Sequence, residues 1–302
     1  MNGKRVLVTG ATGFIGQHLV KSILKDGHSV AIIARDVKKA KDFFEDSVAY
    51  IGFKDNVFDD QLEEFNPEVV VHLASLSTSS DKKDDIVDLI NSNILFVALL
   101  LDRLKELNIK LFINAASFSE YHDNNGILNP TYFYSATKTS ARHMIDYYTK
   151  AYDIKFINTV LYSVYGAKAK SKKVIDYLCD SLASKDTVAM SEGLQVLDFI
   201  HIEDVVNVYL LILKKYEHLE NSFYQFDVGT GIGHNIREVK DELEKISKKS
   251  SNISWGTVVS RKRNTTLAIA NAEPAKEILG WSASISLHDG LESYLRVINN
   301  EN

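Results

Sequence analysis

Three glycines, each three residues after the last, constrain this chain more than any other feature. Gly10, Gly13 and Gly16 lie between an apolar strand-like segment, Lys4–Thr9, and a helical pattern over Phe14–Lys25. A loop of this kind permits a tight turn, a close approach of a pyrophosphate to bare backbone, and close packing of helix on strand. The helix N-terminus adds free N–H groups and a positive dipole end. The context therefore predicts dinucleotide binding rather than an ordinary turn.

Further apolar segments alternate with helical patterns along the chain, which is typical of a parallel sheet covered on both faces. The predicted fold class is therefore α/β with a doubly wound parallel sheet. The predicted helices are Asn93–Leu107 and a stretch from about Thr131 to Tyr152. The predicted strands are Ser29–Ala34, Glu68–Leu73, Lys110–Asn114, Lys155–Leu161, Val196–Ile202, Phe223–Val228 and Ile253–Val259.

The change of pattern after residue 166 predicts two domains. Residues 1–166 form the dinucleotide-binding domain, and 196–228 are expected to return to its sheet. Residues 167–195 and 229–302 form a smaller C-terminal domain for substrate. A length of 302 residues agrees with two domains of about 150 residues each.

Composition excludes several classes of protein. Net charge is −5 and no long basic run appears, so neither nucleic acid nor an anionic membrane is an expected partner. Cys179 is the only cysteine, which excludes an internal disulfide and a cysteine metal cluster. The longest apolar run, Ile94–Leu101, is far shorter than the ~18 residues of a membrane span. We expect a cytoplasmic protein without a metal site.

Tyr134 and Lys138 form a candidate acid/base pair. Their spacing of four places both side chains on one face of the helix predicted over 131–152. A free phenol has a pKa of about 10, too high for efficient proton exchange near neutrality. We expect the Lys138 ammonium to lower the pKa of Tyr134, as acid/base catalysis requires. The alternative is a solvated pair on a helix surface.

The glycine spacing and the run Thr9–Gly16 (TGATGFIG) resemble those of the extended branch of the short-chain dehydrogenase/reductase superfamily, the NAD-dependent epimerase/dehydratase family. Further segments resemble its landmarks over nearly the whole chain: Val71–Ala74, Asn93 with Leu100–Leu101, Asp198–Val205 and Leu279–Trp281. The resemblance implies a Rossmann sheet with a small C-terminal substrate domain.

The resemblance also implies which residues serve the reaction. Ser117 takes the position of the hydroxyl that polarises the substrate carbonyl, with Ser119 as the fallback, and Lys138 would hold the nicotinamide ribose. Asn93 either organises a proton relay or caps its helix. The implied cofactor-binding residues are Gly10, Thr12, Gly13, Phe14, Ile15, Gly16, Arg35, Asp36, Leu73, Ala74, Ser75, Asn93, Tyr134 and Lys138.

The end of the second strand bears on the choice of cofactor. Arg35 is followed by Asp36, with Lys38 and Lys39 one turn further on. An arginine here can accommodate the 2′-phosphate of NADP, whereas an acidic residue binds the ribose hydroxyl of NAD. We favour NADP(H), with NAD(H) as the alternative in which Asp36 is the ribose ligand.

The residues that follow the predicted strand Lys110–Asn114 limit which reactions of this branch the chain can catalyse. Dehydratases of this branch carry Thr-Asp-Glu where this chain has Ser117-Phe118-Ser119, so elimination of water is disfavoured. Within the branch the chain resembles the CDP-abequose and CDP-paratose synthases. Three segments carry this resemblance: Ser191–Gln195, Phe226–Gly231 and Arg261–Asn264.

The implied reaction is NADPH-dependent reduction of the C4 keto group of a nucleotide-linked 4-keto-6-deoxyhexose, namely a CDP-4-keto-3,6-dideoxyhexose made for surface polysaccharide such as lipopolysaccharide O-antigen. One alternative is an NAD-dependent nucleotide-sugar 4-epimerase. Another is a non-catalytic, cofactor-sensing protein of the same fold.

Substrate contacts are assigned by resemblance to Ser119, Ser163 and Arg261. Leu197 departs from the pattern, because related chains place an arginine there that reaches the nucleotide diphosphate. The resemblance also implies a homodimer that is formed through helices 93–107 and 131–152.

Overall fold

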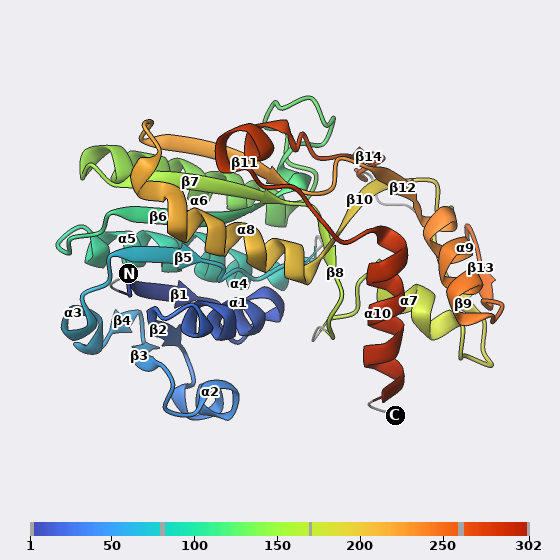
Figure 1. Ribbon diagram of the computed structural model, residues 1–302, viewed down its shortest axis with the longest axis horizontal. Coiled ribbons are helices and arrows are strands. Elements are labelled where there is room, and N and C mark those ends of the chain that lie inside the picture. The colour runs from blue at the N-terminus through green and yellow to red at the C-terminus, as the bar shows by residue number, and fades with distance from the viewer. Residues whose placement is uncertain (1–2, 79–81, 169–170, 259–262, 301–302) are drawn as a thin grey trace.

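The main sheet dominates the molecule in the computed structural model, which describes residues 3–78, 82–168, 171–258 and 263–300 (Figure 1). Its eight strands lie in the order β11-β7-β6-β5-β1-β2-β3-β4, and only β4 runs antiparallel to its neighbour. The strands are β1 (Arg5–Thr9), β2 (Ser29–Ala34), β3 (Ala49–Lys54), β4 (Val57–Phe58), β5 (Val69–His72), β6 (Leu111–Ser117), β7 (Lys155–Leu161) and β11 (Phe223–Val228).

Strand order reverses between β1 and β5. The chain runs outward from β1 through β2 to β3 on one side, and from β5 through β6 to β7 on the other. Thr9, at the end of β1, pairs in register with Ile33 of β2 and with His72 of β5. Ligands of open α/β sheets bind beyond the carboxyl ends of the strands at such a switch point. The glycine loop that follows Thr9 lies there.

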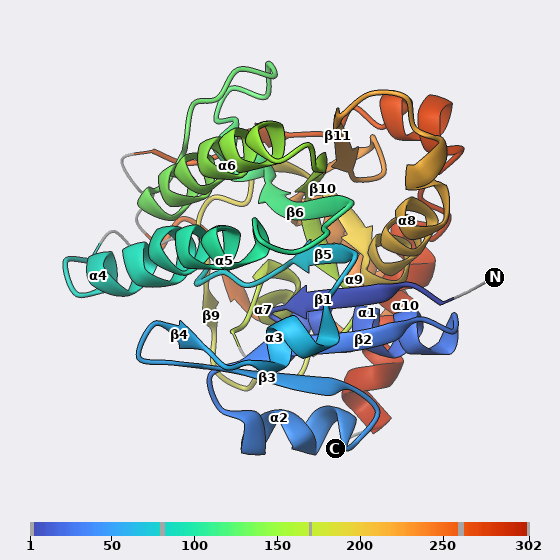
Figure 2. The same ribbon diagram turned by 90° about the vertical axis from the view of Figure 1, so that its left-hand side faces the viewer.

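Helices cover both faces of the sheet (Figure 2). On one face, Val6 and Val8 of β1 share an apolar cluster with α1 (Phe14–Lys25), α2 (Val37–Phe44) and α8 (Ile202–Lys215). On the other face, Leu7 shares a second cluster with α3 (Gln61–Phe65), α5 (Phe96–Leu104) and α6 (Phe133–Ala151). The alternation of neighbouring residues between two buried clusters confirms the predicted doubly wound sheet.

The helix predicted over Asn93–Leu107 has different bounds. A continuous helical run begins earlier, with α4 (Asp85–Ile90), passes through a π-helical turn η1 (Asn91–Leu95) and ends with α5. Asn93 therefore lies inside a helix and does not cap one, so the capping interpretation of Asn93 is wrong. The prediction failed because the apolar run Ile94–Leu101 dominates the pattern, whereas α4 buries only Leu89.

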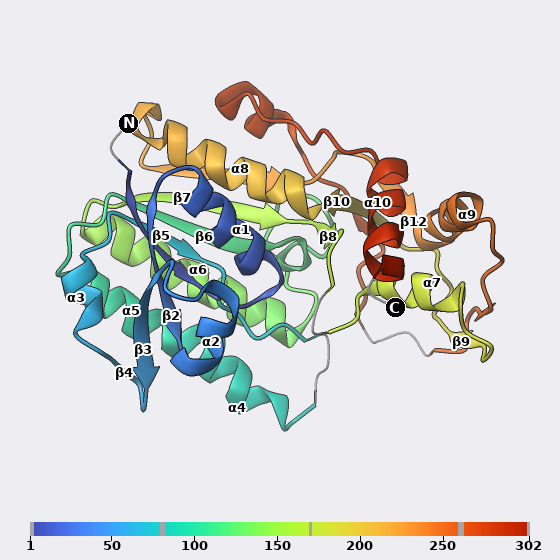
Figure 3. The same ribbon diagram turned by 60° about the horizontal axis from the view of Figure 1, so that its bottom comes forward.

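The smaller half of the molecule contains short elements at one end of the main sheet (Figure 3). Its sheet has β10 at the centre, bonded to β8, β12 and β14, and β9 pairs separately with β13. The elements are β8 (Ser163–Tyr165), α7 (Val174–Ser181), β9 (Val188–Ala189), β10 (Val196–His201), β12 (Gly233–Asn235), α9 (Ile236–Ser247), β13 (Ile253–Ser254), β14 (Leu267–Ala268) and α10 (Leu287–Asn300).

The second sheet corrects two predictions. Segment 196–202 does not return to the main sheet, because β10 pairs with β8, β12 and β14, whereas β11 does join the main sheet beside β7. The strand predicted over 253–259 consists only of β13, and Val259 lies outside the described residues. Short turns η2 (Phe118–Glu120), η3 (Tyr216–His218) and η4 (Ala275–Leu279) complete the secondary structure.

Candidate active site

The glycine loop leaves room that side chains would fill. Gly10 has a φ of +69°, and a Cβ there would lie 2.6 Å from the Ala74 nitrogen beyond β5. A Cβ on Gly16 would lie 2.3 Å from the Gly10 carbonyl oxygen, so α1 packs directly on the loop. Gly13 precedes α1, and no side chain caps the helix. These features fit a dinucleotide, because free N–H groups at a helix N-terminus bind phosphate oxygens.

The segment after β5 forms the second wall of the switch point. The Thr9 hydroxyl accepts a hydrogen bond from the Ala74 N–H (3.1 Å) and lies 2.8 Å from Nδ1 of His72. His72 is 1% exposed, and burial lowers its pKa to about 3, with the Lys138 ammonium adding to the effect. His72 is therefore neutral and holds the ends of β1 and β5 together.

Asn93 connects this segment to α6. Its side-chain oxygen accepts hydrogen bonds from the Ser75 hydroxyl (3.0 Å) and the Leu76 N–H (2.8 Å). Its amide nitrogen donates to the Leu76 carbonyl (3.0 Å) and to the Thr137 hydroxyl (2.9 Å). All four hydrogen bonds of a primary amide are thus made. Asn93 holds the loop after β5 against the helix that carries Tyr134 and Lys138.

Arg35 and Asp36 have different surroundings at the end of β2. The Asp36 carboxylate accepts a hydrogen bond from the Lys39 N–H (3.0 Å) and so caps α2. Arg35 is exposed, and it makes no hydrogen bond or ion pair with any residue in the described ranges. The Asp36 carboxylate therefore caps a helix, whereas the Arg35 guanidinium is available to bind a ligand.

Ser117 ends β6 at the same edge of the sheet. Its hydroxyl lies 2.9 Å from that of Ser119, which in turn accepts from the Ser135 hydroxyl on α6 (2.7 Å). Ser119 is buried in this chain of hydroxyls, whereas Ser117 is partly exposed. This arrangement favours Ser117 over the fallback Ser119 as the hydroxyl that contacts a substrate.

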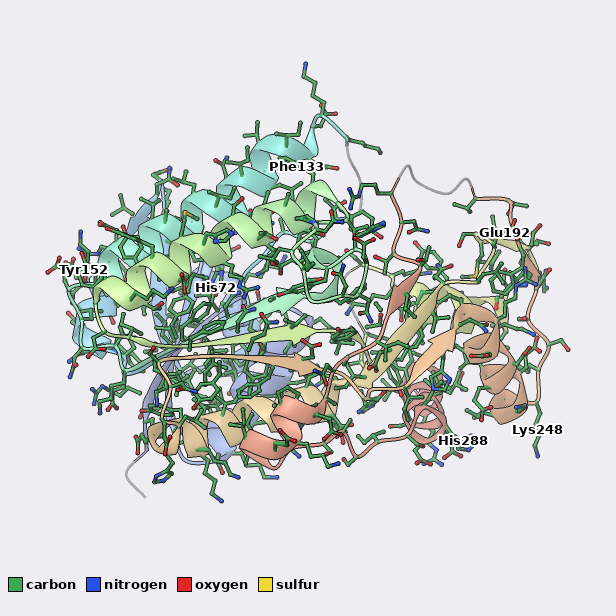
Figure 4. The ribbon with its side chains drawn as sticks, turned by 90° about the horizontal axis from the view of Figure 1, so that it is seen from above. His72, Phe133, Tyr152, Glu192, Lys248 and His288 are labelled. Carbon is green, nitrogen blue, oxygen red and sulfur yellow. The ribbon has the colours of Figure 1, made fainter. Side chains whose placement is uncertain are left out.

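Tyr134 brings the candidate site together from the first turn of α6. The hydroxyls of Ser75, Ser77 and Ser117 lie near its phenol and favour its charged form. The segment after β5, the end of β6 and α6 thus meet around this phenol. Figure 4 labels Phe133 at the start of α6, Tyr152 just beyond its end, and His72 of β5.

The expectation that Lys138 lowers the pKa of Tyr134 is wrong for this structure. Burial raises the pKa of Tyr134 to about 12, the Glu120 carboxylate adds to the rise, and the serine hydroxyls only partly oppose it. Burial also lowers the pKa of Lys138, which is 3% exposed and donates no hydrogen bond within the described part of the chain. Burial from water dominates both groups, which sequence spacing cannot show.

The residues predicted to contact substrate are less completely placed. Ser163 is partly exposed in β8, where it pairs with Phe199 of β10. Leu197 packs between two apolar clusters beside Ala268, so the side chain at this position fills a core. Arg261 lies outside the described residues.

Arg263 and Lys173 are two basic residues whose side chains bind other parts of the protein. Arg263 donates to the Asn129 side chain (2.7 Å). Lys173 donates to the Val164 carbonyl (3.0 Å), and its ammonium lies 4.0 Å from the ring centre of Phe14. Burial lowers the pKa of Lys173 to about 8. Lys173 therefore joins the smaller half to the start of α1.

Two residues at the site were missed by sequence reasoning. Ser77 follows β5 in an irregular loop, and no pattern indicated that its hydroxyl would reach Tyr134. Glu120 follows Ser117 by three residues and is 0% exposed. The spacing of Ser117 and Glu120 is that of a capping box, which the structure contains, and this spacing was a signal available in the sequence.

Fold and site together define a Rossmann-type α/β protein with a dinucleotide-type glycine loop and a serine, a tyrosine and a lysine at the carboxyl edge of its sheet. Residues 6–229 match the model of the NAD dependent epimerase/dehydratase family. The chain belongs to this family and is a member of its nucleotide-sugar-modifying, NAD(P)-dependent enzymes.

Individual relatives agree with this assignment. CDP-abequose synthase of Salmonella muenchen is 30% identical over 97% of both chains, and that of Yersinia pseudotuberculosis is 28% identical over 83% of this chain and 87% of the relative. Among solved structures, UDP-glucuronic acid 4-epimerase from Bacillus cereus superposes with a TM-score of 0.86 over 99% of this chain and 100% of that one, at 23% identity. None of the helices in the described ranges has the length and apolar character that crossing a bilayer requires.

Proposed function

We propose that the protein reduces the C4 keto group of a nucleotide-linked 4-keto-6-deoxyhexose with NADPH, and that the substrate is a CDP-4-keto-3,6-dideoxyhexose. The observation that carries the proposal is the 30% identity to a CDP-abequose synthase over 97% of both chains. A match of this length includes both the sheet that holds the glycine loop and the smaller half, where the family resemblance places the sugar nucleotide.

The proposed mechanism uses the hydroxyl groups around Tyr134. The cofactor, when bound, supplies a hydride to the carbonyl carbon. Tyr134 donates its phenolic proton to the carbonyl oxygen, and the Ser117 hydroxyl polarises that oxygen by a hydrogen bond. A pKa of about 12 keeps the phenol protonated at neutral pH, which is the form that a proton donor must have. Lys138 would hold the nicotinamide ribose with the donors that it leaves unused.

Residues after β6 support reduction rather than elimination. Removing water across C5 and C6 requires a free acid/base pair of carboxyl groups near the sugar. Phe118 instead stacks on Tyr162 with ring centres 5.7 Å apart, and Ser119 is enclosed by its neighbours. Glu120 is the carboxyl group of this turn, and both its oxygens accept hydrogen bonds from the protein.

The surroundings of Arg35 support NADPH as the reductant. The guanidinium is exposed, whereas the carboxylate of Asp36 is bound to the start of α2. A planar guanidinium pairs with a phosphate through charge-assisted, bidentate hydrogen bonds. The 2′-phosphate of NADPH is the group that this side chain would bind.

The test is NADPH oxidation followed at 340 nm against a panel of 4-keto sugar nucleotides, with CDP-, dTDP- and UDP-linked members. We expect turnover with a CDP-linked 4-keto-3,6-dideoxyhexose and no turnover without a sugar. Tightly bound NAD in the purified protein, together with interconversion of C4 epimers, would identify a 4-epimerase instead. Cofactor binding without turnover of either kind would identify a cofactor-sensing protein.

We also propose that two copies associate through α4–α5 and α6, in accord with the dimer that the resemblance implies for helices 93–107 and 131–152. Large apolar side chains are exposed on these helices, including Val87 (63%) on α4 and Tyr147 (66%) on α6. Light scattering at micromolar protein should give about twice the monomer mass of 33.9 kDa. A clean monomer would contradict the proposal.

A further inference from the structure

Lys173 brings a positive charge from the smaller half to the start of α1. It directly precedes α7. Its ammonium lies 4.0 Å from the ring centre of Phe14, the first residue of α1, and donates a hydrogen bond to the Val164 carbonyl (3.0 Å). An ammonium group has three donors, so two of them remain for a ligand.

The charge of Lys173 has no carboxylate partner within 4 Å among the residues that the structure describes. Asp176 attracts it, but the Asp176 carboxylate accepts the backbone N–H of Lys173 (2.6 Å) and the Tyr294 hydroxyl instead. The residue as a whole is exposed, whereas its ammonium lies against Phe14 and Val164. A cation held against protein without a paired anion is unfavourable, so this position favours an anionic ligand.

The start of α1 has the complementary feature. The N–H groups of Phe14 and Ile15 have no acceptor in the described part of the chain, and neither a side-chain cap nor an acidic residue occupies the first turn. Such N–H groups after a glycine loop bind the phosphates of a dinucleotide. Phe14 belongs to both features, because its backbone begins the helix and its ring contacts the Lys173 ammonium.

We infer that Lys173 is a cofactor-binding residue contributed by the smaller half, and that its ammonium donates hydrogen bonds to the pyrophosphate that the glycine loop binds. The inference goes beyond the proposed function, because it concerns binding of the dinucleotide and holds for any sugar substrate. The pyrophosphate is then held by both halves of the molecule, by backbone N–H groups of α1 and by the side chain that precedes α7.

A sugar nucleotide also carries a diphosphate, which the same ammonium is chemically able to bind. The contact with Phe14 favours the cofactor, because Phe14 begins the helix that follows the glycine loop. α7 itself packs in the core of the smaller half through Ile175 and Leu178. A cofactor bound by Lys173 therefore connects that core to the glycine loop.

The experiment measures the binding of NADPH by its fluorescence, without any sugar substrate. Lys173→Met keeps the apolar stem and removes the charge, so the Kd for NADPH should rise about tenfold, the low end for hydrogen bonds to a charged group. Lys173→Arg keeps the charge, and its Kd should stay within about threefold of the wild type. Lys173→Gln is a second neutral variant with the same expected rise. NADH replaces NADPH if the wild type binds NADH more tightly.

Lys172→Met is the matched control, because Lys172 is the preceding residue and its ammonium pairs with Asp180 (2.6 Å). Its Kd for NADPH should equal that of the wild type. Added salt should weaken NADPH binding less steeply in Lys173→Met, since one charge contact has been lost. The inhibition constant of adenosine as a competitor should be the same in every variant, because adenosine has no phosphate.

An unchanged Kd for NADPH in Lys173→Met would overturn the inference. An equal rise in Lys172→Met, or weaker binding of adenosine in Lys173→Met, would overturn it as well, because the loss would then not come from a contact with the pyrophosphate.

CDP, titrated alone by calorimetry, distinguishes the two diphosphates. Weaker CDP binding with unchanged NADPH binding in Lys173→Met would assign Lys173 to the sugar nucleotide and overturn the inference. The proposed function fails separately, since turnover of 4-keto sugar nucleotides tests it and binding of the cofactor does not.

Discussion

Different interactions stabilise the two halves of the molecule internally. In the main sheet, long parallel strands pair in continuous register, as in β6 and β7, whose pairing extends from Leu111 and Lys155 to Ser117 and Leu161. In the smaller half the strands are short: β12 has three residues, and β9, β13 and β14 have two each. Ladders of this length provide few hydrogen bonds, so other contacts must hold these elements.

Buried carboxylates supply those contacts. Asp198, which is 0% exposed on β10, accepts hydrogen bonds from the N–H groups of Thr230, Gly231 and Ala270 and from the Thr230 hydroxyl. Asp204, at the start of α8, accepts from the N–H groups of Ser284 and Ile285 and from the Ser284 hydroxyl. Single side chains thus bind loops that no strand register fixes. The main sheet should tolerate the loss of one polar side chain better than the smaller half does.

The largest effect is expected from Asp198→Ala. The change removes the acceptor of four donors, of which the Ala270 N–H is buried and the others are partly buried. A buried donor left unsatisfied costs about 1–3 kcal/mol. We expect the free energy of unfolding in urea to fall by at least about 3 kcal/mol. Limited proteolysis should cut within residues 229–300 before it cuts the main sheet.

Asp46→Ala is the control, because the Asp46 side chain is 95% exposed. Its effect should stay within about 0.5 kcal/mol. If Asp198→Ala lowers the free energy of unfolding no more than Asp46→Ala does, the stability of the smaller half does not depend on its buried carboxylates.

The second prediction moves to the main sheet and concerns catalysis. Tyr134→Phe keeps the ring and deletes the proton donor, so turnover should fall by at least about 10²-fold, the usual scale for general acid catalysis. NADPH affinity should barely change. Tyr147→Phe is the matched control, since Tyr147 is exposed on the same helix and should leave turnover unchanged. Turnover like the wild type in Tyr134→Phe would remove Tyr134 from the mechanism.

The same contrast explains what could be predicted from the sequence. Ser29–Ala34, Lys155–Leu161 and Phe223–Val228 were predicted to the residue, because continuous apolar strands between helices have a clear pattern. The partners of β10 could not be predicted, since the burial of a strand does not say which sheet covers it. Strands of two residues, such as β13, are too short to show any period.

The candidate site likewise contains some residues whose positions the sequence indicates and others whose positions it does not. The placement of Ser117, Tyr134 and the glycine loop follows from strand ends and helix spacing, which the sequence shows. Ser77 lies in an irregular loop without periodicity, so no pattern indicates that it lies near Tyr134. Glu120 shows the spacing of a capping box with Ser117, but that spacing does not reveal its electrostatic effect on Tyr134. The pKa of Tyr134 depends on burial, which only packing determines.

The third prediction concerns the choice of cofactor at the end of β2 in the main sheet. Charge-assisted hydrogen bonds from Arg35 to a 2′-phosphate are worth about 1.5–3 kcal/mol, or roughly one to two decades in affinity. Arg35→Ala should raise the KM for NADPH by that factor and leave the KM for NADH almost unchanged. Lys41→Ala is the control, because Lys41 lies on α2 and pairs with Asp46 just beyond that helix. A wild-type preference for NADH, or an unaltered ratio of kcat/KM values, would show that Arg35 binds no phosphate.

The smallest effect is a difference in how the two halves respond to acid. His72 in β5 has a pKa of about 3 when folded and about 6.5 when unfolded, because burial disfavours its charged form. The unfolded chain binds the extra proton between these values, so the stability that neutral His72 permits is present above pH 6.5 and is lost as pH falls. At pH 5.5 the loss is about 1.4 kcal/mol. His288 in α10 has the opposite sign, since the Glu242 carboxylate raises its pKa and their pairing is lost as pH rises.

Unfolding in urea at pH 7.5 and 5.5 measures this difference. His72→Gln lowers stability at both values through lost packing, but the fall from pH 7.5 to 5.5 should be about 1.4 kcal/mol smaller than in the wild type. His288→Gln should make the fall slightly larger, because it removes a pair that is strongest in acid. Other histidines cancel in each comparison, since wild type and variant share them. If the free energy of unfolding of His72→Gln falls between pH 7.5 and 5.5 by as much as that of the wild type, protonation of His72 does not destabilise the protein in acid. His72 would then give no difference between the two halves in their response to acid.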